Sequence, residues 1–112
     1  MKKKPLELRQ YQVVVVNLEP SLGSETRKVR PCIIISPAEM NDNLRTVIIA
    51  PLTSQNKGYP TRVPVYVNKQ RGYVMLEQIR TIDKRRISKT GDRLKRTEIS
   101  ALKRVLREML ID

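Results

Sequence analysis

The chain has 112 residues, 39% of them hydrophobic, and a formal net charge of +12 at pH 7. This length fits one domain with one compact core, which we expect residues 1–112 to form. Because the chain has no histidine and one cysteine, a Ser-His-Asp triad, a histidine metal site, a zinc cage and an intramolecular disulfide are excluded. A pI near 10.4 favours a polyanionic partner, most often nucleic acid, with a merely basic soluble protein as the alternative.

Residues 1–10 are rich in lysine and arginine but lack the apolar region of a signal peptide. We therefore expect them to form a basic, mobile leader. No apolar stretch approaches membrane-spanning length, and a single cysteine suits a reducing compartment. The sequence thus predicts a soluble, cytoplasmic protein with no membrane partner.

The most informative stretch, residues 22–36, joins a polar loop to an abrupt apolar strand. A β-branched run at residues 13–16 predicts the strand before it, and residues 32–35 predict the strand that the loop enters. Pro31 fixes its own backbone and pushes Arg30 toward an extended conformation. Arg30 is therefore presented from the start of a rigid element, which suits recognition of a phosphodiester.

The middle of the chain reads as short strands separated by turns. Ser36 and Pro37 resemble the N-cap and first position of a single helical turn. Pro64 favours an edge or bulge position for its strand. Further strands are predicted at residues 46–52, 62–67 and 73–76, with turns at 68–72 and 91–92.

The last element is the clearest, an amphipathic helix that begins near Thr97. Thr97 is a good N-cap, and Glu98 suits the positive end of the helix dipole. One apolar stripe, predicted to pack against the sheet, contains Ile99, Leu102, Leu106, Met109 and Leu110. The predicted fold is mainly β with α: a small β-barrel of five or six strands closed by one C-terminal helix.

The residue inventory also narrows the possible chemistry. The eleven carboxylates are scattered, which argues against a two-metal site, and no phosphate-cradling glycine motif is present. An enzyme acting on nucleic acid with these residues should need no metal or other cofactor. RNA is then the natural substrate, because its own 2′-hydroxyl can attack the adjacent phosphate.

Four motifs in a fixed order carry a resemblance to a known family. They are Gly-Ser-Glu at residues 23–25 with Arg-Pro at 30–31, Ile-Ile-Ile-Ser-Pro at 33–37 with Asn41, Ala-Pro-Leu-Thr-Ser at 50–54, and Leu-Glu-Gln-Ile-Arg-Thr-Ile-Asp at 76–83. With this order and spacing, residues 12–110 resemble the MazF/PemK family, the toxin halves of type II toxin–antitoxin pairs.

The resemblance implies an SH3-like β-barrel of the CcdB/PemK type that forms a homodimer. It implies an mRNA interferase, a metal-independent endoribonuclease that cuts single-stranded mRNA at specific sequences. The 2′-hydroxyl attack would leave 2′,3′-cyclic phosphate and 5′-hydroxyl ends. Neutralisation by a cognate acidic antitoxin protein is implied as well.

The resemblance also assigns catalytic residues. Arg30 matches the family's catalytic arginine, and Thr53 matches the threonine that closes the third strand. Glu77 stands where some members place an aspartate proposed as proton acceptor; a solvated strand-end carboxylate is the alternative. Met75 stands where some members carry a second catalytic arginine. Cys32 is expected to be a core hydrophobe rather than a catalytic thiol, because no histidine exists to activate it.

A concave basic surface between loops 19–28 and 55–60, at the dimer interface, is expected to hold the RNA. Tyr59 is expected to stack on an unpaired base. Gln78 either reads a base edge or braces the loop, and Lys84 belongs either to a phosphate-binding surface or to a solvated turn. The predicted RNA-binding residues are Ser24, Glu25, Arg27, Lys28, Ser54, Tyr59, Gln78 and Lys84.

Other readings remain open at this stage. Tyr73 is expected to be half-buried packing, and Arg80 is expected to pair with Asp83. One alternative function is a non-enzymatic toxin of the same barrel class that binds a protein such as DNA gyrase. The joint presence of Arg30 and Thr53 argues against it. The other alternative is a catalytically silent RNA-binding barrel.

Overall fold

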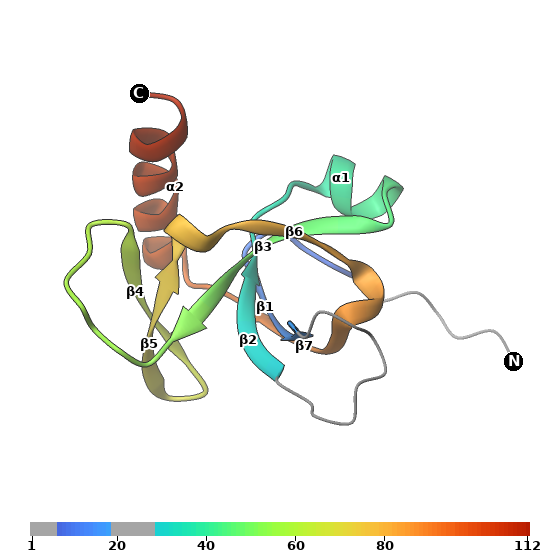
Figure 1. Cartoon of the computed structure of the whole chain (residues 1–112), viewed down its shortest axis with the longest axis horizontal. Coiled ribbons are helices and arrows are strands. Elements are labelled where there is room, and N and C mark those ends of the chain that lie inside the picture. The colour runs from blue at the N-terminus through green and yellow to red at the C-terminus, as the bar shows by residue number, and fades with distance from the viewer. Residues whose placement is uncertain (1–6, 19–28) are drawn as a thin grey trace, which may run out of the picture.

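Figure 1 shows the computed structural model of the chain, in which residues 7–18 and 29–112 are described. Within these residues, seven strands form a curled antiparallel sheet, accompanied by two α-helices and two short 3-10 helices. No described helix is long and apolar enough to cross a membrane. In chain order the elements are β1 (Gln12–Asn17), β2 (Val29–Ile34), α1 (Ala38–Asn43), β3 (Thr46–Thr53), β4 (Arg62–Val67), β5 (Gln70–Met75), η1 (Leu76–Gln78), β6 (Arg80–Asp83), η2 (Lys84–Arg86), β7 (Ile87–Arg93) and α2 (Arg96–Leu110).

The long strand β3 lies at the centre of the sheet. The strand order is β4-β5-β3-β2-β1-β7, and β6 also pairs with β3. On the edge of β3 away from β2, β6 pairs with its first half and β5 with Leu52 and Thr53 at its end. The three-residue helix η1 separates β5 from β6. In this helix Leu76 is fully buried and Glu77 is exposed.

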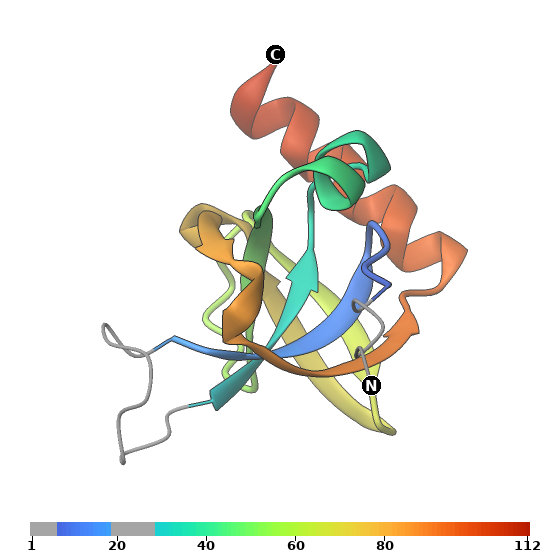
Figure 2. The same ribbon diagram turned by 90° about the vertical axis from the view of Figure 1, so that its right-hand side faces the viewer.

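Two hydrophobic cores lie on the two faces of this sheet. One, on the side of the β4–β5 hairpin and α2, contains Ile33, Ala50 and Leu52. The other, closed by β6 and β7, contains their strand neighbours Cys32 and Ile34. Alternate residues of β2 and β3 therefore enter different cores, which explains why these strands are nearly continuous apolar runs. Figure 2 shows the curl of the sheet from the side, with α2 against one flank.

The predicted fold class, mainly β with a C-terminal helix, is confirmed, and the curled sheet forms a half-barrel. The strand predicted at residues 62–67 is β4, and it ends the strand order, so the edge position predicted from Pro64 is also confirmed. The count of five or six strands was too low, because β6 and β7 were not predicted. Only Ile82 of β6 is buried, so the sequence of this strand contains no apolar run that would predict it.

The turn predicted at residues 91–92 is wrong, because β7 runs through it. The pairing of β7 with β1 shifts register between Gln12 and Val14, so the glycine and aspartate make a bulge rather than a reversal. The Gln12 side-chain amide donates to the Gly91 carbonyl at 3.0 Å, which holds the bulge in place. A Cβ at Gly91 would meet the Val13 carbonyl oxygen at 3.4 Å, so glycine fits this close approach.

Both predicted helix caps are corrected. Pro37 precedes α1 as its N-cap, and the Ser36 hydroxyl instead donates to Asn41 Oδ1 at 2.6 Å and accepts from the Ile48 N–H at 3.0 Å. Lys95 rather than Thr97 precedes α2. The Glu98 carboxylate accepts from the Lys95 N–H, as in a capping box.

The stripe predicted on α2 is confirmed in part, whereas the described end of the N-terminal leader differs from the mobile segment predicted. Leu102 is fully buried in the first core, with most of the stripe packed around it, but Leu110 is 62% exposed. Of the predicted mobile leader, residues 1–6 lie outside the described residues. Leu8 is buried in the second core and Gln10 donates to the Ile35 carbonyl at 2.9 Å, so this end of the leader is packed against the sheet.

Candidate functional site

The β2–β3 ladder leads toward Arg30 on one strand and Thr53 on the other. The antiparallel pairs are Cys32–Pro51, Ile33–Ala50 and Ile34–Ile49. The ladder ends at Cys32–Pro51; extended by two residues, the same register would align Arg30 with Thr53, and aligned residues project from the same face of the sheet. The site thus follows from a ladder whose interior is buried on both faces.

Arg30 and Thr53 also line one open cavity of about 490 Å³, which we call the Arg30 pocket. It lies where β2 begins, where β3 ends and where the β4–β5 hairpin turns. Its lining residues are Val29, Arg30, Pro31, Leu52, Thr53, Ser54, Gln55, Val67, Asn68, Gln70, Arg71 and Gly72. Of the predicted site residues, the structure brings Arg30, Thr53 and Ser54 together here.

Arg71 is a second guanidinium in this pocket that sequence reasoning missed. Its Nη2 donates to the Tyr66 hydroxyl at 2.9 Å, and its Cζ lies 5.0 Å from the centre of the Tyr66 ring. The hydrogen bond to Tyr66 raises the pKa of Arg71 further, so the side chain is always charged. Met75, where some family members carry a second arginine, is buried in the fold. The available signal in the sequence was a basic residue two positions after the Asn68–Lys69 turn.

Glu77 is not among the residues that line the Arg30 pocket. Its carboxylate accepts from Thr61 Oγ1 at 2.9 Å and from Arg62 Nε and Nη2 at 3.1 and 3.0 Å. Partial burial acts to raise the pKa of Glu77, but hydrogen bonds from its own backbone, Thr61 and Arg62 outweigh this and lower it. The catalytic role predicted for Glu77 stays a prediction, and its contacts are those of an ion pair.

The other predicted RNA contacts are dispersed. Tyr59 is 48% exposed in the loop between β3 and β4, and Gln78 is exposed on η1. Lys84 is half-buried, and its ammonium donates to the Asn41 carbonyl, which ties η2 to α1. The remaining predicted contacts, Ser24, Glu25, Arg27 and Lys28, lie outside the described residues.

The predicted Arg80–Asp83 pair is wrong. Asp83 pairs with Arg85 at 3.0 Å, and the hydrogen bonds from Arg85 lower the pKa of Asp83. Residues three apart on a strand project to opposite faces, so Arg80 points away from Asp83. Tyr73 is half-buried on β5 opposite Thr53, in agreement with a packing role.

Cys32 is fully buried beside Arg30, and its environment supports the packing role predicted for it. Burial raises the pKa of Cys32 to about 12, although nearby Arg30 and Arg80 act to lower it. Because thiolate forms only near that pH, we expect native protein at pH 8 to resist alkylation by iodoacetamide, while urea-unfolded protein reacts fully. Mass spectrometry after timed quenching measures this, and rapid alkylation of the folded protein would contradict the buried placement.

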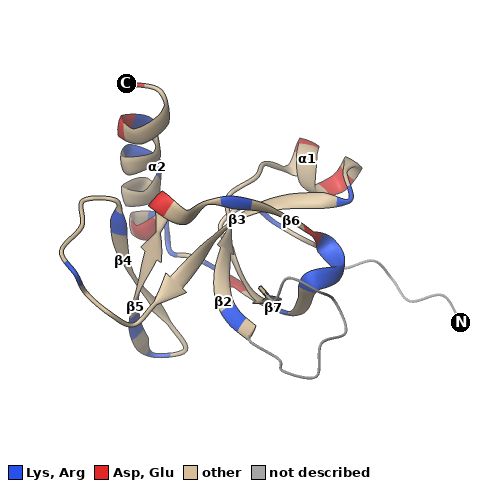
Figure 3. Cartoon of the chain, in the orientation of Figure 1, with Lys and Arg blue, Asp and Glu red and all other residues tan. Residues whose placement is uncertain are grey.

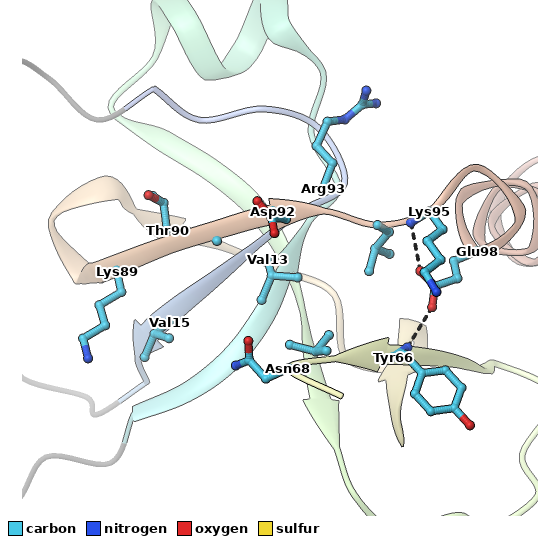
Figure 4. Close-up of a pocket in the computed structure, with 13 residues that line it drawn as sticks. Val13, Val15, Tyr66, Asn68, Lys89, Thr90, Asp92, Arg93, Lys95 and Glu98 are labelled. Carbon is cyan, nitrogen blue, oxygen red and sulfur yellow. Dashed lines mark hydrogen bonds between the residues drawn. The ribbon is translucent and has the colours of Figure 1, made fainter. Parts of the chain in front are cut away.

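A second cavity, of about 350 Å³, lies on the other side of the hairpin turn. It is bounded by β1, β7 and the start of α2, and Figure 4 shows Lys89, Arg93 and Lys95 around it. At one end, the Glu98 carboxylate accepts from the Lys95 N–H at 2.9 Å and from the Tyr66 N–H at 2.7 Å. Through these two hydrogen bonds the Glu98 carboxylate joins α2 to the edge strand β4.

The charges of the described residues are spread widely. Figure 3 shows lysines and arginines on β2, on the β4–β5 hairpin, on η2 and along α2. Within residues 7–18 and 29–112, no group of three His, Cys, Asp or Glu side chains gathers where it could hold a metal ion. The open pocket with two guanidiniums and a threonine hydroxyl therefore suits an anion with a reacting oxygen, such as a phosphodiester.

Residues 9–110 match the model of the PemK-like, MazF-like toxins of type II toxin–antitoxin systems. The chain belongs to this family. It is similar to the endoribonuclease toxin MazF of Escherichia coli (strain K12), with 30% identity over 70 residues. That alignment spans 62% of this chain and 63% of the relative, which is less than two thirds of the relative's length.

Solved structures of the MazF-like family share the fold. MazF (Form-I) from Deinococcus radiodurans superposes with a TM-score of 0.75 at 26% identity, over 91% of this chain and 94% of that one. A MazE–MazF structure (Form-II) from the same organism gives a TM-score of 0.75 at 25% identity, with the same coverage. The resemblance to the MazF/PemK family read from the sequence motifs is thereby confirmed.

Proposed function

We propose that this chain is the toxin of a type II toxin–antitoxin system and acts as a metal-independent endoribonuclease on single-stranded mRNA. The observation that carries the proposal is that Arg30, Thr53 and Arg71 line one open pocket. Family membership and the similarity to a MazF endoribonuclease toxin support it.

In the proposed reaction, the 2′-hydroxyl of one nucleotide attacks the adjacent phosphorus. A bond forms between O2′ and phosphorus while the bond from phosphorus to O5′ breaks. The 2′-hydroxyl gives up its proton to solvent and the leaving O5′ takes one up, giving 2′,3′-cyclic phosphate and 5′-hydroxyl ends. Arg30 binds the non-bridging oxygens and stabilises the charge that develops on them, and Thr53 orients the 2′-hydroxyl or the phosphate. Arg71 adds positive charge to the same pocket, whereas Met75 contributes none.

The proposed partners follow from charge and family. A net charge of +12 suits an mRNA substrate and an acidic antitoxin. The MazE–MazF structures of D. radiodurans support an antitoxin partner of this kind. We further propose a cytoplasmic homodimer, because a small core gains stability from a shared interface. The RNA sequence that is cut would depend on the loops around the Arg30 pocket.

Incubation of the purified protein with a long single-stranded RNA in excess EDTA tests the activity directly. We expect discrete fragments whose 3′ ends carry cyclic phosphate and whose 5′ ends are phosphorylated by polynucleotide kinase without prior dephosphorylation. The reason is that the attacking oxygen belongs to the substrate, so no metal-bound water is required. RNA retention without cleavage would favour a silent RNA-binding barrel, and no interaction would favour a toxin with a protein target.

A further inference from the structure

Tyr59, Arg62 and Glu77 form a connected cluster outside the Arg30 pocket. The Arg62 guanidinium carbon lies 4.6 Å from the centre of the Tyr59 ring. Arg62 also donates from Nε and Nη2 to Glu77 Oε2, and its side chain is only 10% exposed. Thr61 Oγ1 donates to the other carboxylate oxygen of Glu77. The arginine beneath the ring is therefore held by a two-bond ion pair rather than by solvent.

The backbone around Tyr59 is fixed as well. Gly58 adopts a positive φ of 71°, and its N–H donates to Asn56 Oδ1 at 3.0 Å. The Tyr59 carbonyl accepts from the Arg62 N–H at 3.0 Å, which closes the turn into β4. Ring and main chain are thus both positioned before any ligand arrives, so little ordering remains to oppose binding.

The exposed part of the Tyr59 ring suits a flat, uncharged partner. Tyr59 is 48% exposed, although its ring already packs on Arg62. An aromatic ring with a cation on one side and solvent beyond is an arrangement on which unpaired bases stack. Tyr66 also packs on an arginine, but Arg71 bonds the Tyr66 hydroxyl itself, and no carboxylate of the described residues pairs with Arg71.

The cluster is continuous with the Arg30 pocket along the chain. Ser54 and Gln55 line that pocket and begin the loop that ends at Tyr59. Across the sheet, Thr53 pairs with Tyr73 of β5, and Met75, two residues further along β5, pairs with Arg62. Because Tyr73 and Met75 lie two residues apart on β5, their partners Thr53 and Arg62 project from the same face of the sheet.

We propose that Tyr59 is a stacking platform for an unpaired base flanking the cleaved bond, and that Arg62 and Glu77 are positioning residues that fix its ring. This inference rests on the proposed cleavage of RNA. It gives Glu77 a role in substrate binding, because both of its carboxylate oxygens are engaged at the cluster and Glu77 does not line the Arg30 pocket.

Binding of an uncleavable RNA tests the platform. A fluorescein-labelled, mixed-sequence 2′-O-methyl RNA lacks the attacking hydroxyl, and its Kd is measured by fluorescence anisotropy. We expect Tyr59→Ala to weaken binding about 5- to 100-fold, and Tyr59→Phe to stay within about 2-fold of wild type, because stacking needs the ring alone. Lys57→Ala is the matched control: it removes an exposed charge from the same loop, and we expect at most about a 3-fold, salt-dependent loss.

A covalent readout locates the contact. When 5-iodouracil replaces one base in that RNA, irradiation should cross-link it to the peptide that contains Tyr59, as identified by mass spectrometry. A Tyr59→Ala variant that binds as tightly as wild type, or cross-links confined to other peptides, would overturn the platform.

Cleavage kinetics separate positioning from proton transfer by Glu77. We expect Glu77→Gln and Arg62→Met each to raise KM, with the double variant no worse than the more affected single one, because both act through the same ring. The dependence of kcat on pH should keep its shape. If Glu77→Gln removed the acidic limb of that profile while Arg62→Met left kcat intact, Glu77 would be the general base and the positioning role would be wrong.

The two proposals fail separately. Cleavage by wild-type protein, with binding unaffected by Tyr59→Ala, refutes the platform and leaves the endoribonuclease standing. Tyr59-dependent binding of the 2′-O-methyl RNA by a protein that cuts no RNA in EDTA refutes the proposed activity and keeps the platform.

Discussion

Arg30→Ala should lower the rate of RNA cleavage about 100- to 1000-fold, the loss typical when one preorganised donor to a developing oxyanion is removed. Arg30 has no carboxylate partner among the described ion pairs and lies exposed at the start of β2, so its guanidinium is available to the phosphate. Arg30→Lys should recover little, because a lysine cannot bind two phosphate oxygens in one plane. Single-turnover cleavage at saturating protein measures both effects.

A matched control removes an arginine elsewhere. Arg104 is exposed on α2, outside the Arg30 pocket, so Arg104→Ala takes away the same charge and side chain. It should change cleavage at most a few-fold and only through the salt dependence of RNA binding. Equal rates for Arg30→Ala and wild type, with circular dichroism showing an intact fold, would contradict the proposed mechanism.

Leu102→Ala should destabilise the fold by about 2–5 kcal/mol, the usual range for a fully buried leucine. Leu102 has no exposed surface and sits in the first core, where α2 covers the half-barrel. The truncation removes hydrophobic contacts and leaves a cavity that neighbouring side chains fill only in part. Urea unfolding at a fixed protein concentration, followed by circular dichroism, gives the free energy of unfolding.

Leu110→Ala, on the same helix, is the control for Leu102→Ala. Leu110 is 62% exposed, so Leu110→Ala makes the same chemical change where little is buried, and about 0.5 kcal/mol or less is expected. Similar losses for the two variants would mean that α2 does not pack on the sheet through Leu102.

The sequence predicted the parts of the fold that bury apolar side chains in a regular pattern. The strand of residues 62–67 alternates between buried valines and exposed residues, and α2 carries a 3.6-residue stripe. The strands that it did not predict are stabilised by pairing with a neighbouring strand and carry no regular hydrophobic pattern. Strand β7 buries only Ile87 and exists because β1 pairs with it across a bulge. No local propensity distinguishes such a strand from a turn.

The site shows the same division. Residue chemistry and motif order predict Arg30 and Thr53, and the antiparallel pairing of β2 with β3 brings these residues, 23 positions apart, to one pocket. Arg71 was missed because its place in the pocket depends on the tight turn at Asn68 and Lys69, where two non-glycine residues adopt positive φ. Its position in a motif points to Glu77, but Glu77 lies on η1 and its ion-pair partner, Arg62, comes from β4.

Because the pairing of β2 with β3 positions Arg30 and Thr53, a substitution that disturbs this pairing should also abolish the proposed activity. A slip of one residue between these strands would turn every side chain of one strand to the other face and separate the two groups. Colonies that survive induction of this gene should therefore carry lesions at Ile33, Ala50 or Ile34 as well as at Arg30. In such survivors the Arg30 guanidinium and the Thr53 hydroxyl would no longer lie in one pocket.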